Sequence, residues 1–291
     1  MSDVAIVGLG IMGGAIARHL AAAGFAVTGC DIDPTARAAA KAHGVNTLPT
    51  LGSALPRSGV VLLSLASAAA VSTVISELRA ASVPLVIADT STLSLPDKKA
   101  MAALLTGTPH SLLDCPISGT GAQMANRDVV IYASGEDRAL AQARPFLEAI
   151  SRKTIPLGQF GNGTAAKLIA NYLVAVHNVA TAEAMRLGVA AGIDPATLID
   201  AVQSGAGNSR IFELRAPLIA KKCFTPPTMK LSVWAKDMAA IEAFAASLDI
   251  RSPLIEAIDP LYRAALEQGL GDLDTAAVAL ALPASIKKDS Q

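Results

Sequence analysis

A lysine and an asparagine lie four positions apart in GNGTAAKLIAN, residues 161–171. Gly163 can begin a helix, which places Lys167 and Asn171 one above the other on a single face. Asn178 returns to within about 20° of that face, given 3.6 residues per turn. The surrounding residues are mostly apolar, and lysine is rarely buried unless something pairs with it. Two interpretations remain: a structural lysine whose charge reaches water, or a proton carrier in a dry cleft.

A proton carrier would take part in acid–base chemistry, of which the oxidation of an alcohol or the reduction of a carbonyl group is one example. Oxidising an alcohol removes the hydroxyl proton as hydride leaves the same carbon for a nicotinamide, and reducing an aldehyde supplies that proton. A buried lysine can exchange this proton because burial lowers the pKa of an ammonium group toward neutrality. An asparagine beside it can orient the hydroxyl without adding charge.

A glycine-rich turn near the N-terminus indicates where a nicotinamide cofactor would bind. GLGIMG follows the apolar strand Val4 to Val7 and opens an amphipathic helix. This spacing is typical of dinucleotide sites, although a packing turn is the alternative. The helix N-terminus then faces the negative charge of a pyrophosphate. The residues expected to bind the cofactor are Gly8, Gly10, Ile11, Met12 and Gly13.

An aspartate ends the second predicted strand, FAVTGCD, and favours NAD over NADP. Asp31 lies about 20 residues beyond the last glycine of the turn, where a carboxylate can accept hydrogen bonds from the adenosine ribose. A phosphate on that ribose would be repelled, and Ile32 stands where an arginine could bind one. Asp33 is expected to cap a helix that begins at Pro34. FAD would need further contacts that the sequence does not show.

Four segments resemble, in order and spacing, the β-hydroxyacid dehydrogenases, the family that includes 3-hydroxyisobutyrate dehydrogenase. They are GLGIMG, DCPISGT at 114–120, GNGTAAKLIAN at 161–171 and WAKDMAA at 234–240, and the resemblance covers nearly the whole chain. It implies hydride transfer between NAD and a small 3-hydroxy acid or the corresponding semialdehyde. An imine reductase on the same scaffold and a catalytically silent NAD-binding module are the alternatives, and Lys167 argues against the former.

The resemblance also implies roles for individual residues. Thr92, in DTSTLSLP, would lie near the nicotinamide end of the cofactor, and Lys236 would approach the nicotinamide ribose or amide. Ser118 and Gly119 would bind the substrate carboxylate through a hydroxyl and a backbone N–H. Lys167 would be the catalytic acid and base.

Several positions depart from the family pattern or leave a role open. Asn171 would contact the substrate, but Ala170 replaces a second asparagine that is frequent in relatives. Thr120 stands where most members have glycine, so it would narrow the substrate site or add a hydrogen-bond donor. Arg127 and Arg210 are either solvated or bind an acidic substituent of the substrate.

The order of predicted elements indicates two domains. Short β-type runs, from DVAIVGLG to DVVIYASG, alternate with helical stretches up to about residue 158, which predicts an α/β fold. We expect a Rossmann-type, doubly wound, mainly parallel sheet in an NAD-binding domain over residues 1–162. Helical patterns alone follow, which predicts an all-α substrate and dimerisation domain over residues 163–291. Residues 164 to about 190 should form one long helix shared by both domains.

Composition excludes several classes of function. Charged residues make up 16% of the 291 residues and the formal net charge is zero, without the cluster of Lys and Arg that nucleic-acid binding needs. No window is apolar enough to span a membrane. The start, MSDVAIVGLG, lacks the basic region of an export signal, so a cytoplasmic protein is expected.

The remaining residue types suggest neither disulfides nor metal. Cys30, Cys115 and Cys223 are odd in number and widely spaced, and we expect buried thiols. The histidines share no metal-ligand spacing, so no metal site is expected. Alanine-rich helix faces pack closely and need covering, which favours a homodimer or homotetramer.

Overall fold

The computed structural model describes residues 3–52 and 55–283. It divides into two compact units, of which the first ends at Lys167 and the second begins at Leu168. Helix α7, Asn162–Ala190, begins in the first unit and continues into the second. The long helix expected in the middle of the sequence is therefore present. The proposed domain boundary between residues 162 and 163 falls at the start of this helix.

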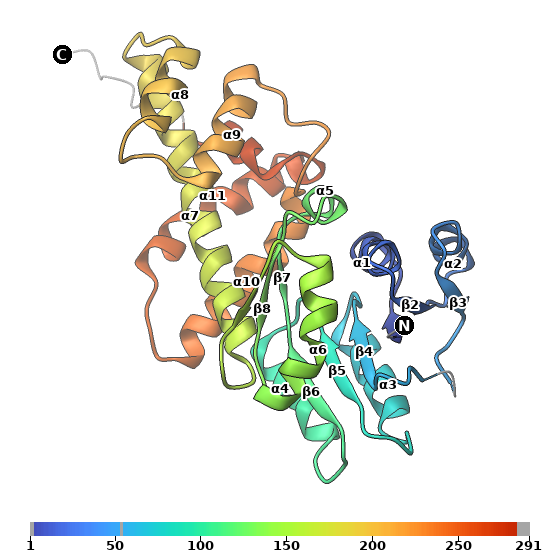
Figure 1. Ribbon diagram of the computed structural model, residues 1–291. Helices are drawn as coiled ribbons and strands as arrows, with labels where there is room; N and C mark the ends of the chain where they lie inside the picture. Colours follow the sequence, from blue (N-terminus) through green and yellow to red (C-terminus); the bar gives the residue numbers. More distant parts are fainter. Residues whose placement is uncertain (1–2, 53–54, 284–291) are drawn as a thin grey trace, which may run out of the picture. The chain divides into compact units, whose positions relative to one another are not determined.

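The first unit contains a sheet of six parallel strands (Figure 1). Its strand order is β3-β2-β1-β4-β5-β6, with every neighbouring pair parallel. This order reverses between β1 and β4, as in doubly wound dinucleotide-binding folds, and ligands bind such sheets beyond the carboxyl ends of the strands at that point. The expected fold class is confirmed. The strands are β1 (Asp3–Val7), β2 (Ala26–Cys30), β3 (Asn46–Leu48), β4 (Val60–Leu63), β5 (Val86–Asp89) and β6 (Ser111–Asp114).

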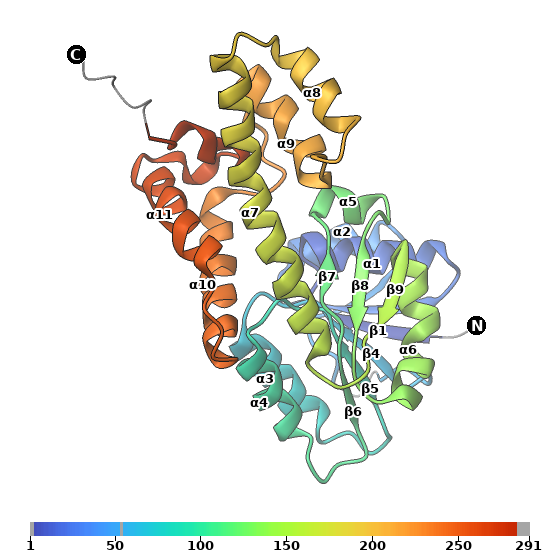
Figure 2. The ribbon, with the colours of Figure 1, turned by 90° about the vertical axis from the view of Figure 1, so that its left-hand side faces the viewer.

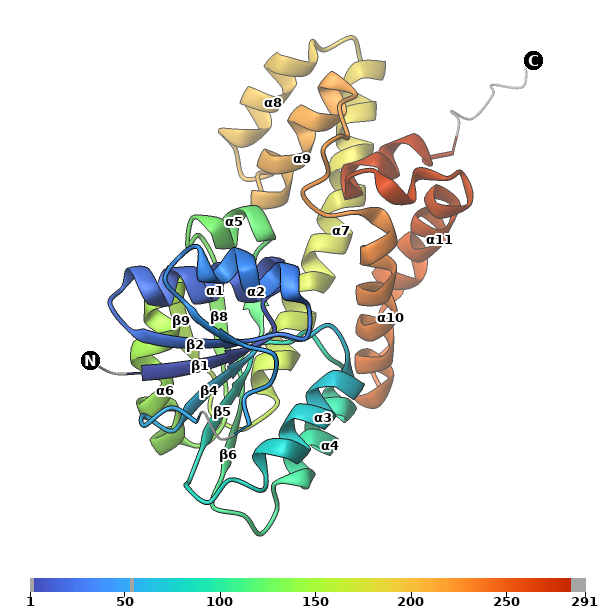
Figure 3. The same ribbon diagram turned by 90° about the vertical axis from the view of Figure 1, so that its right-hand side faces the viewer.

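Helices cover both faces of this sheet because its strands are apolar on both sides (Figure 3). In β1, Val4 and Ile6 pack into one core, whereas Ala5 between them packs into the other. The first core includes residues of α1, α2 and α6, and the second includes residues of α3 and α4. These helices are α1 (Ile11–Ala22), α2 (Pro34–Lys41), α3 (Ala68–Leu78), α4 (Leu95–Leu104) and α6 (Asp137–Ile150).

A second, three-stranded sheet continues from the end of β6 (Figure 2). Its members are β7 (Ile117–Ser118), β8 (Val130–Ala133) and β9 (Lys153–Pro156), and the short helix α5 (Gly121–Ala125) connects the first two. The run containing β8 was expected in the main sheet, and this is wrong. The chain turns back after β6, so β7 pairs with β8 in antiparallel orientation, and a single bridge between Asp114 and Ser134 joins the two sheets.

All helices and 3-10 turns of the second unit's described part surround apolar cores, and this confirms the all-α expectation. The larger core contains residues of α7, α10, α11 and η2, whereas a smaller core joins α7 to α8 and α9. Figure 1 shows α8 and α9 as one pair of helices and α10 and α11 as another. The elements are α8 (Pro195–Gln203), α9 (Arg210–Lys221), α10 (Leu231–Ser247), α11 (Pro253–Glu267), η1 (Leu270–Asp272) and η2 (Thr275–Leu280).

One cysteine departs from the sequence-based expectation. Cys30 and Cys115 are buried, but Cys223 is exposed. It follows Lys222, the left-handed residue that ends α9, and the next residue, Phe224, fills the core instead. Within residues 3–52 and 55–283, no helix is long and apolar enough to cross a membrane.

Candidate functional site

Two glycines of the N-terminal turn are required by the packing of the chain itself. Gly8 has φ +93°, and a Cβ atom placed on it would lie 2.2 Å from the carbonyl oxygen of Ser64, just beyond β4. A Cβ on Gly13 would lie 1.9 Å from the carbonyl oxygen of Gly8. Neither position has space for any side chain. These two glycines therefore bring the turn, α1 and the end of β4 into close contact.

The middle glycine is different, because nothing in the fold requires it. A Cβ on Gly10 would meet no atom within 4 Å, and its φ of −62° suits any residue. Gly10 is also the N-cap of α1 and, lacking a side chain, makes no capping hydrogen bond to the N–H groups of the first turn. Open space, free N–H donors and the positive end of a helix dipole together fit a pyrophosphate. Ile11 and Met12 form the first turn of this helix.

The backbone fixes the carboxylate of Asp31 beside this turn. Oδ2 accepts a hydrogen bond from the N–H of Leu9 at 2.6 Å, and Oδ1 accepts one from the N–H of Asp33 at 2.8 Å. Each oxygen keeps lone pairs that can accept a ribose hydroxyl. Ile32 is 87% exposed. Asp33 caps α2 by accepting from the N–H of Thr35, as expected.

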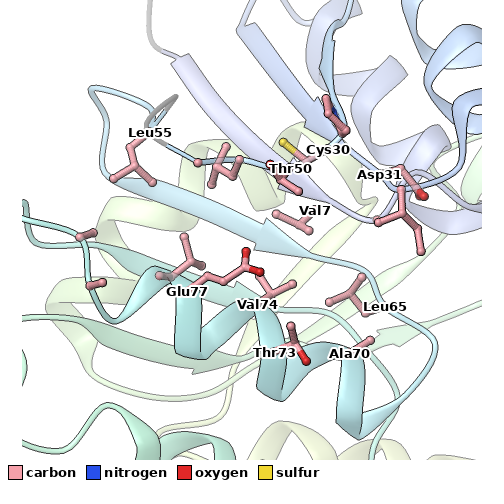
Figure 4. Close-up of a pocket in the computed structure, with 18 of the residues that line it drawn as sticks. Val7, Cys30, Asp31, Thr50, Leu55, Leu65, Ala70, Thr73, Val74 and Glu77 are labelled. Carbon is pink, nitrogen blue, oxygen red and sulfur yellow. The ribbon is translucent and has the colours of Figure 1, made fainter.

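A pocket of about 920 Å³ extends from Gly8 and Asp31 over one part of the sheet (Figure 4). Its walls come from β1, β2, α3 and the segments that follow β3 and β4, and they are mainly apolar, as at Leu65 and Val74. Asp31 and Glu77 are its acidic residues, and no Lys or Arg is among the described residues that line it. The pocket therefore suits the adenosine half of a dinucleotide.

The predicted substrate loop follows the end of β6. Ser118 ends β7 and is partly buried. Gly119 has φ +148°, and a Cβ on it would lie 2.6 Å from Cγ1 of Val129, so the loop requires glycine here. Thr120 caps α5: its hydroxyl accepts from the N–H of Gln123, and its own N–H donates to the Gln123 side chain at 3.0 Å. The capping box thus fixes the direction of the Thr120 side chain.

This loop lies directly against the predicted cofactor turn. A Cβ on Gly121 would lie 2.8 Å from Cγ2 of Ile11, so α5 begins in contact with the first residue of α1. The ring of His19, farther along α1, lies 2.8 Å from the carbonyl oxygen of Met124 in α5. The structure therefore brings the predicted substrate loop and the predicted pyrophosphate site next to each other.

Lys167 and Thr92 belong to the same unit as the glycine turn. Lys167 is half-buried in the second turn of α7, and Thr92 is exposed three residues beyond β5. Hydrogen bonds at the beginning of α7 hold this helix to the sheet: the N–H of Thr164 donates to Oδ2 of Asp114 at 2.6 Å. Asp114 is the last residue of β6.

The remaining predicted residues lie in the second unit. Asn171 is only 6% exposed, and its side-chain amide donates to Oδ2 of Asp237 in α10 at 3.3 Å. Lys236, the residue before Asp237, is exposed. Asn178, the third polar residue expected on that face of α7, is fully buried.

A buried lysine that the sequence analysis did not single out lies near the end of β5. Lys98 is 0% exposed, and its Nζ lies 2.7 Å from Oδ2 of Asp89 and 3.2 Å from Oδ1 of Asp114. Burial opposes the charged form of Lys98, but the attraction of the two carboxylates is larger, so its pKa is raised. Its only local signal is its position between Asp97 and Lys99 in α4, which any amphipathic surface helix could show.

The two arginines with open roles have partners within the protein. Arg127 is exposed, adopts a left-handed conformation with φ 59°, and donates to the carbonyl oxygen of Glu148 at 3.2 Å. Arg210 forms an exposed ion pair with Glu213 at 3.0 Å. In the described part of the chain, no group of His, Cys, Asp and Glu is arranged to hold a metal ion.

The sheet order, the glycine turn and the pocket beside Gly8 and Asp31 define the first unit as a dinucleotide-binding domain. Comparison with known families agrees and is more specific. Residues 3–158 match the family described as NAD binding domain of 6-phosphogluconate dehydrogenase. Residues 161–282 match the family described as NAD-binding of NADP-dependent 3-hydroxyisobutyrate dehydrogenase. The chain belongs to the β-hydroxyacid dehydrogenase family of NAD-binding oxidoreductases.

Individual relatives are similar along nearly their whole length. The L-threonate dehydrogenase of Cupriavidus necator is 33% identical over 290 residues, which cover 97% of this chain and 96% of the relative. The 3-hydroxyisobutyrate dehydrogenase of Mycobacterium tuberculosis, solved with L-serine, is 30% identical with a TM-score of 0.88, covering 98% of this chain and 100% of that chain. An imine reductase from Pseudomonas sp. shares the fold at 20% identity, with a TM-score of 0.61, 97% of this chain and 99% of that chain being covered.

Proposed function

We propose that this protein transfers a hydride between NAD and a small 3-hydroxy acid, or the corresponding semialdehyde. The observation that carries the proposal is the contact between Gly121 and Ile11, because it sets the substrate loop against the cofactor turn. The relatives that act on L-threonate and 3-hydroxyisobutyrate support the substrate class. Both compounds, like L-serine, carry a carboxylate and a hydroxyl on the third carbon.

The residues of the substrate loop would hold the carboxylate. In this proposal the Ser118 hydroxyl and the Gly119 N–H donate hydrogen bonds to it. The Thr120 hydroxyl, whose direction the capping box fixes, donates to a polar substituent on the second carbon. L-Threonate carries a hydroxyl there and 3-hydroxyisobutyrate a methyl group, so this position would favour the former.

Lys167 would act as the acid and base of the reaction. When bound, the nicotinamide ring of NAD supplies the hydride acceptor. In the neutral form, Nζ of Lys167 takes the hydroxyl proton as the C–H bond breaks; in the reverse direction its ammonium form donates that proton to the carbonyl oxygen. We propose further that Asn171 orients the hydroxyl, while Thr92 and Lys236 contact the nicotinamide end of the cofactor.

The adenosine pocket supports NAD as the preferred cofactor. Asp31 offers a carboxylate at the ribose, and Glu77 adds a second negative charge to a pocket without Lys or Arg among its described residues. An added phosphate would be repelled by both carboxylates and would find no cation. NAD, whose ribose hydroxyls can donate hydrogen bonds, avoids both problems.

Self-association and a cytoplasmic location complete the proposal. Large apolar side chains are exposed on the second unit, including Leu187 at 71% and Ile250 at 59%, and they would be covered in a homodimer or homotetramer. Light scattering after size-exclusion chromatography measures the assembly, and a monomer at micromolar concentration would refute self-association.

The proposed cytoplasmic location is supported by the thiols. The free thiols Cys30 and Cys115 are compatible with a reducing compartment.

A substrate panel tests the proposed reaction. Purified protein is assayed with L-threonate, 3-hydroxyisobutyrate, L-serine and matched 2-hydroxy acids, with NAD or NADP, by the absorbance of the reduced cofactor. We expect turnover of at least one 3-hydroxy acid and a higher kcat/KM with NAD. Cofactor binding without any turnover would instead favour a silent NAD-binding module. In a parallel assay with cyclic imines and the reduced cofactor, imine reduction without turnover of any 3-hydroxy acid would favour the imine reductase alternative.

A further inference from the structure

The buried ions around Lys98 join three different elements of the first unit. Lys98 lies in α4, Asp89 ends β5 and Asp114 ends β6. Besides the two carboxylates, Nζ of Lys98 donates to the carbonyl oxygen of Asp89 at 3.2 Å, so all three of its hydrogens have acceptors. All three side chains are completely buried. A charge buried to this degree is tolerated only when it is fully paired and hydrogen-bonded. The positions of the ammonium group and the two carboxylates are therefore closely fixed relative to one another.

One side of this ion cluster holds the first turn of α7. Asp114 accepts from the backbone N–H of Thr164 at 2.6 Å through Oδ2 and from its hydroxyl at 2.8 Å through Oδ1. The preceding N–H, that of Gly163, donates to the hydroxyl of Ser134 at 2.9 Å. These N–H groups would otherwise have no partner inside the helix. The carboxylate of Asp114 thus holds the start of α7 through its negative charge and through hydrogen bonds of defined direction.

Close packing against the strands also fixes the start of α7. A Cβ on Gly163 would lie 2.4 Å from the carbonyl oxygen of Tyr132 and 2.6 Å from that of Asp114. The start of α7 therefore rests directly on the backbone of β6 and β8. Lys167 follows one turn later, four residues after Gly163 and on the same face of the helix.

The other side of the cluster reaches the predicted cofactor site. Oδ1 of Asp89 accepts from the N–H of Ser91 at 2.9 Å. The hydroxyl of Ser91 in turn accepts from the N–H of Leu65 at 2.9 Å, and Leu65 lines the adenosine pocket. Thr92 is the next residue of this segment. One set of buried hydrogen bonds therefore connects the segment of Thr92 to the first turn of α7.

We infer that Lys98, through Asp89 and Asp114, is a positioning residue that sets Lys167 relative to the bound dinucleotide. This inference rests on the proposed function, in which Lys167 exchanges the substrate proton. Lys98 does not touch substrate in this account. Its ammonium group fixes the distance between the carboxylates of Asp89 and Asp114. Those carboxylates hold the Thr92 segment and the start of α7. Loss of the ammonium group would leave two buried carboxylates in mutual repulsion and would release the helix end.

The test replaces Lys98 by a side chain of similar length without charge. Lys98→Met is compared with Lys99→Met, which changes the exposed neighbour on the same helix. We expect amide exchange at residues 163 and 164 to become at least about 10-fold faster in Lys98→Met, measured by hydrogen exchange with mass spectrometry. We also expect kcat to fall by about 10- to 100-fold, since misplacement by about 1 Å can cost two orders of magnitude. KM for the acid and Kd for NAD should change less than about threefold.

The same measurements separate positioning from simple stabilisation. A cluster that only stabilises the fold predicts a lower Tm for Lys98→Met but wild-type kcat and exchange below that Tm, and this would overturn the inference. If Lys98→Met does not fold, Thr164→Val decides, because it keeps the side-chain shape and removes the 2.8 Å bond to Asp114. Wild-type kcat and exchange in Thr164→Val would then refute positioning.

Failure of the inference is distinguishable from failure of the proposed function. If Lys167→Ala retains turnover, the acid–base proposal fails whatever Lys98→Met does. If Lys167→Ala loses turnover while Lys98→Met keeps it, only the positioning inference fails. The exchange measurement needs neither substrate nor cofactor, so it tests the contact with α7 independently of catalysis.

Discussion

Adding one methyl group at Gly10 or at Gly13 should have opposite consequences, although both glycines belong to one motif. At Gly10, alanine fits the backbone and the new Cβ meets no protein atom within 4 Å. The free energy of unfolding should therefore change by less than about 1 kcal/mol, because alanine restricts the unfolded chain but is a poorer N-cap than glycine. The methyl group would instead occupy the space proposed for the pyrophosphate.

The magnitudes follow from these contacts. Overpacking a close contact costs about 1–3 kcal/mol, so the Kd for NAD should rise about 5- to 150-fold in Gly10→Ala. In Gly13→Ala the Cβ would lie 1.9 Å from the carbonyl oxygen of Gly8 before any relaxation. The free energy of unfolding should then decrease by the same amount or more. At about 2–4 °C per kcal/mol for a protein of this size, Tm should fall by roughly 2–12 °C.

Thermal unfolding without cofactor and isothermal titration with NAD measure the two effects separately. Gly10→Ala should keep a Tm close to that of the unmodified protein and lose affinity for NAD, while Gly13→Ala should have a lower Tm. Wild-type affinity in Gly10→Ala would refute the close approach of the cofactor to this turn. An unchanged Tm in Gly13→Ala would refute the packing argument.

Two further predictions concern the adenosine pocket and the thiols. Asp31→Ser should weaken NAD binding about 10-fold or more, since hydrogen bonds to a charged group contribute about 1.5–3 kcal/mol, and it should improve NADP binding; an unchanged ratio of the two Kd values in titration calorimetry would contradict the ribose assignment. Iodoacetamide at pH 8 should label exposed Cys223 and spare Cys30, because burial raises the pKa of Cys30 to about 11 and keeps the unreactive thiol form until the pH nears that value. Peptide mass spectrometry reads the labelling, and early modification of Cys30 would contradict its burial.

Strong periodic patterns made much of the fold predictable. The apolar runs of β1, β4 and β5, each followed by a helical stretch, indicated a parallel sheet, and the proline-free segment after Thr164 indicated the long helix α7. The strands β3 and β9 gave no such signal, since Asn46–Leu48 has three residues and Lys153–Pro156 begins and ends with poor strand formers. The sheet to which β8 belongs depends on a chain reversal after β6, which local patterns do not encode.

Candidate site residues could be picked out from the sequence where they form a motif of characteristic spacing along the chain. Gly8, Gly10 and Gly13 could be recognised together, but the different reasons for each glycine are visible only when β4 lies beside the turn. Lys98, in helix α4, was missed because its partners come from two strands and lie 9 and 16 residues away in the sequence. Whether a lysine is buried depends on tertiary contacts, and Lys99 beside it is exposed.

The central claim is that Lys167 exchanges the proton of the substrate hydroxyl. Single-turnover reduction of NAD by Lys167→Ala, with saturating 3-hydroxy acid and followed at the absorbance of the reduced cofactor, tests it most directly. The account predicts a rate constant about 100- to 10,000-fold below that of the unmodified protein, with the Kd for NAD unchanged. A rate constant within about threefold of the unmodified protein, at the same NAD occupancy, would contradict it.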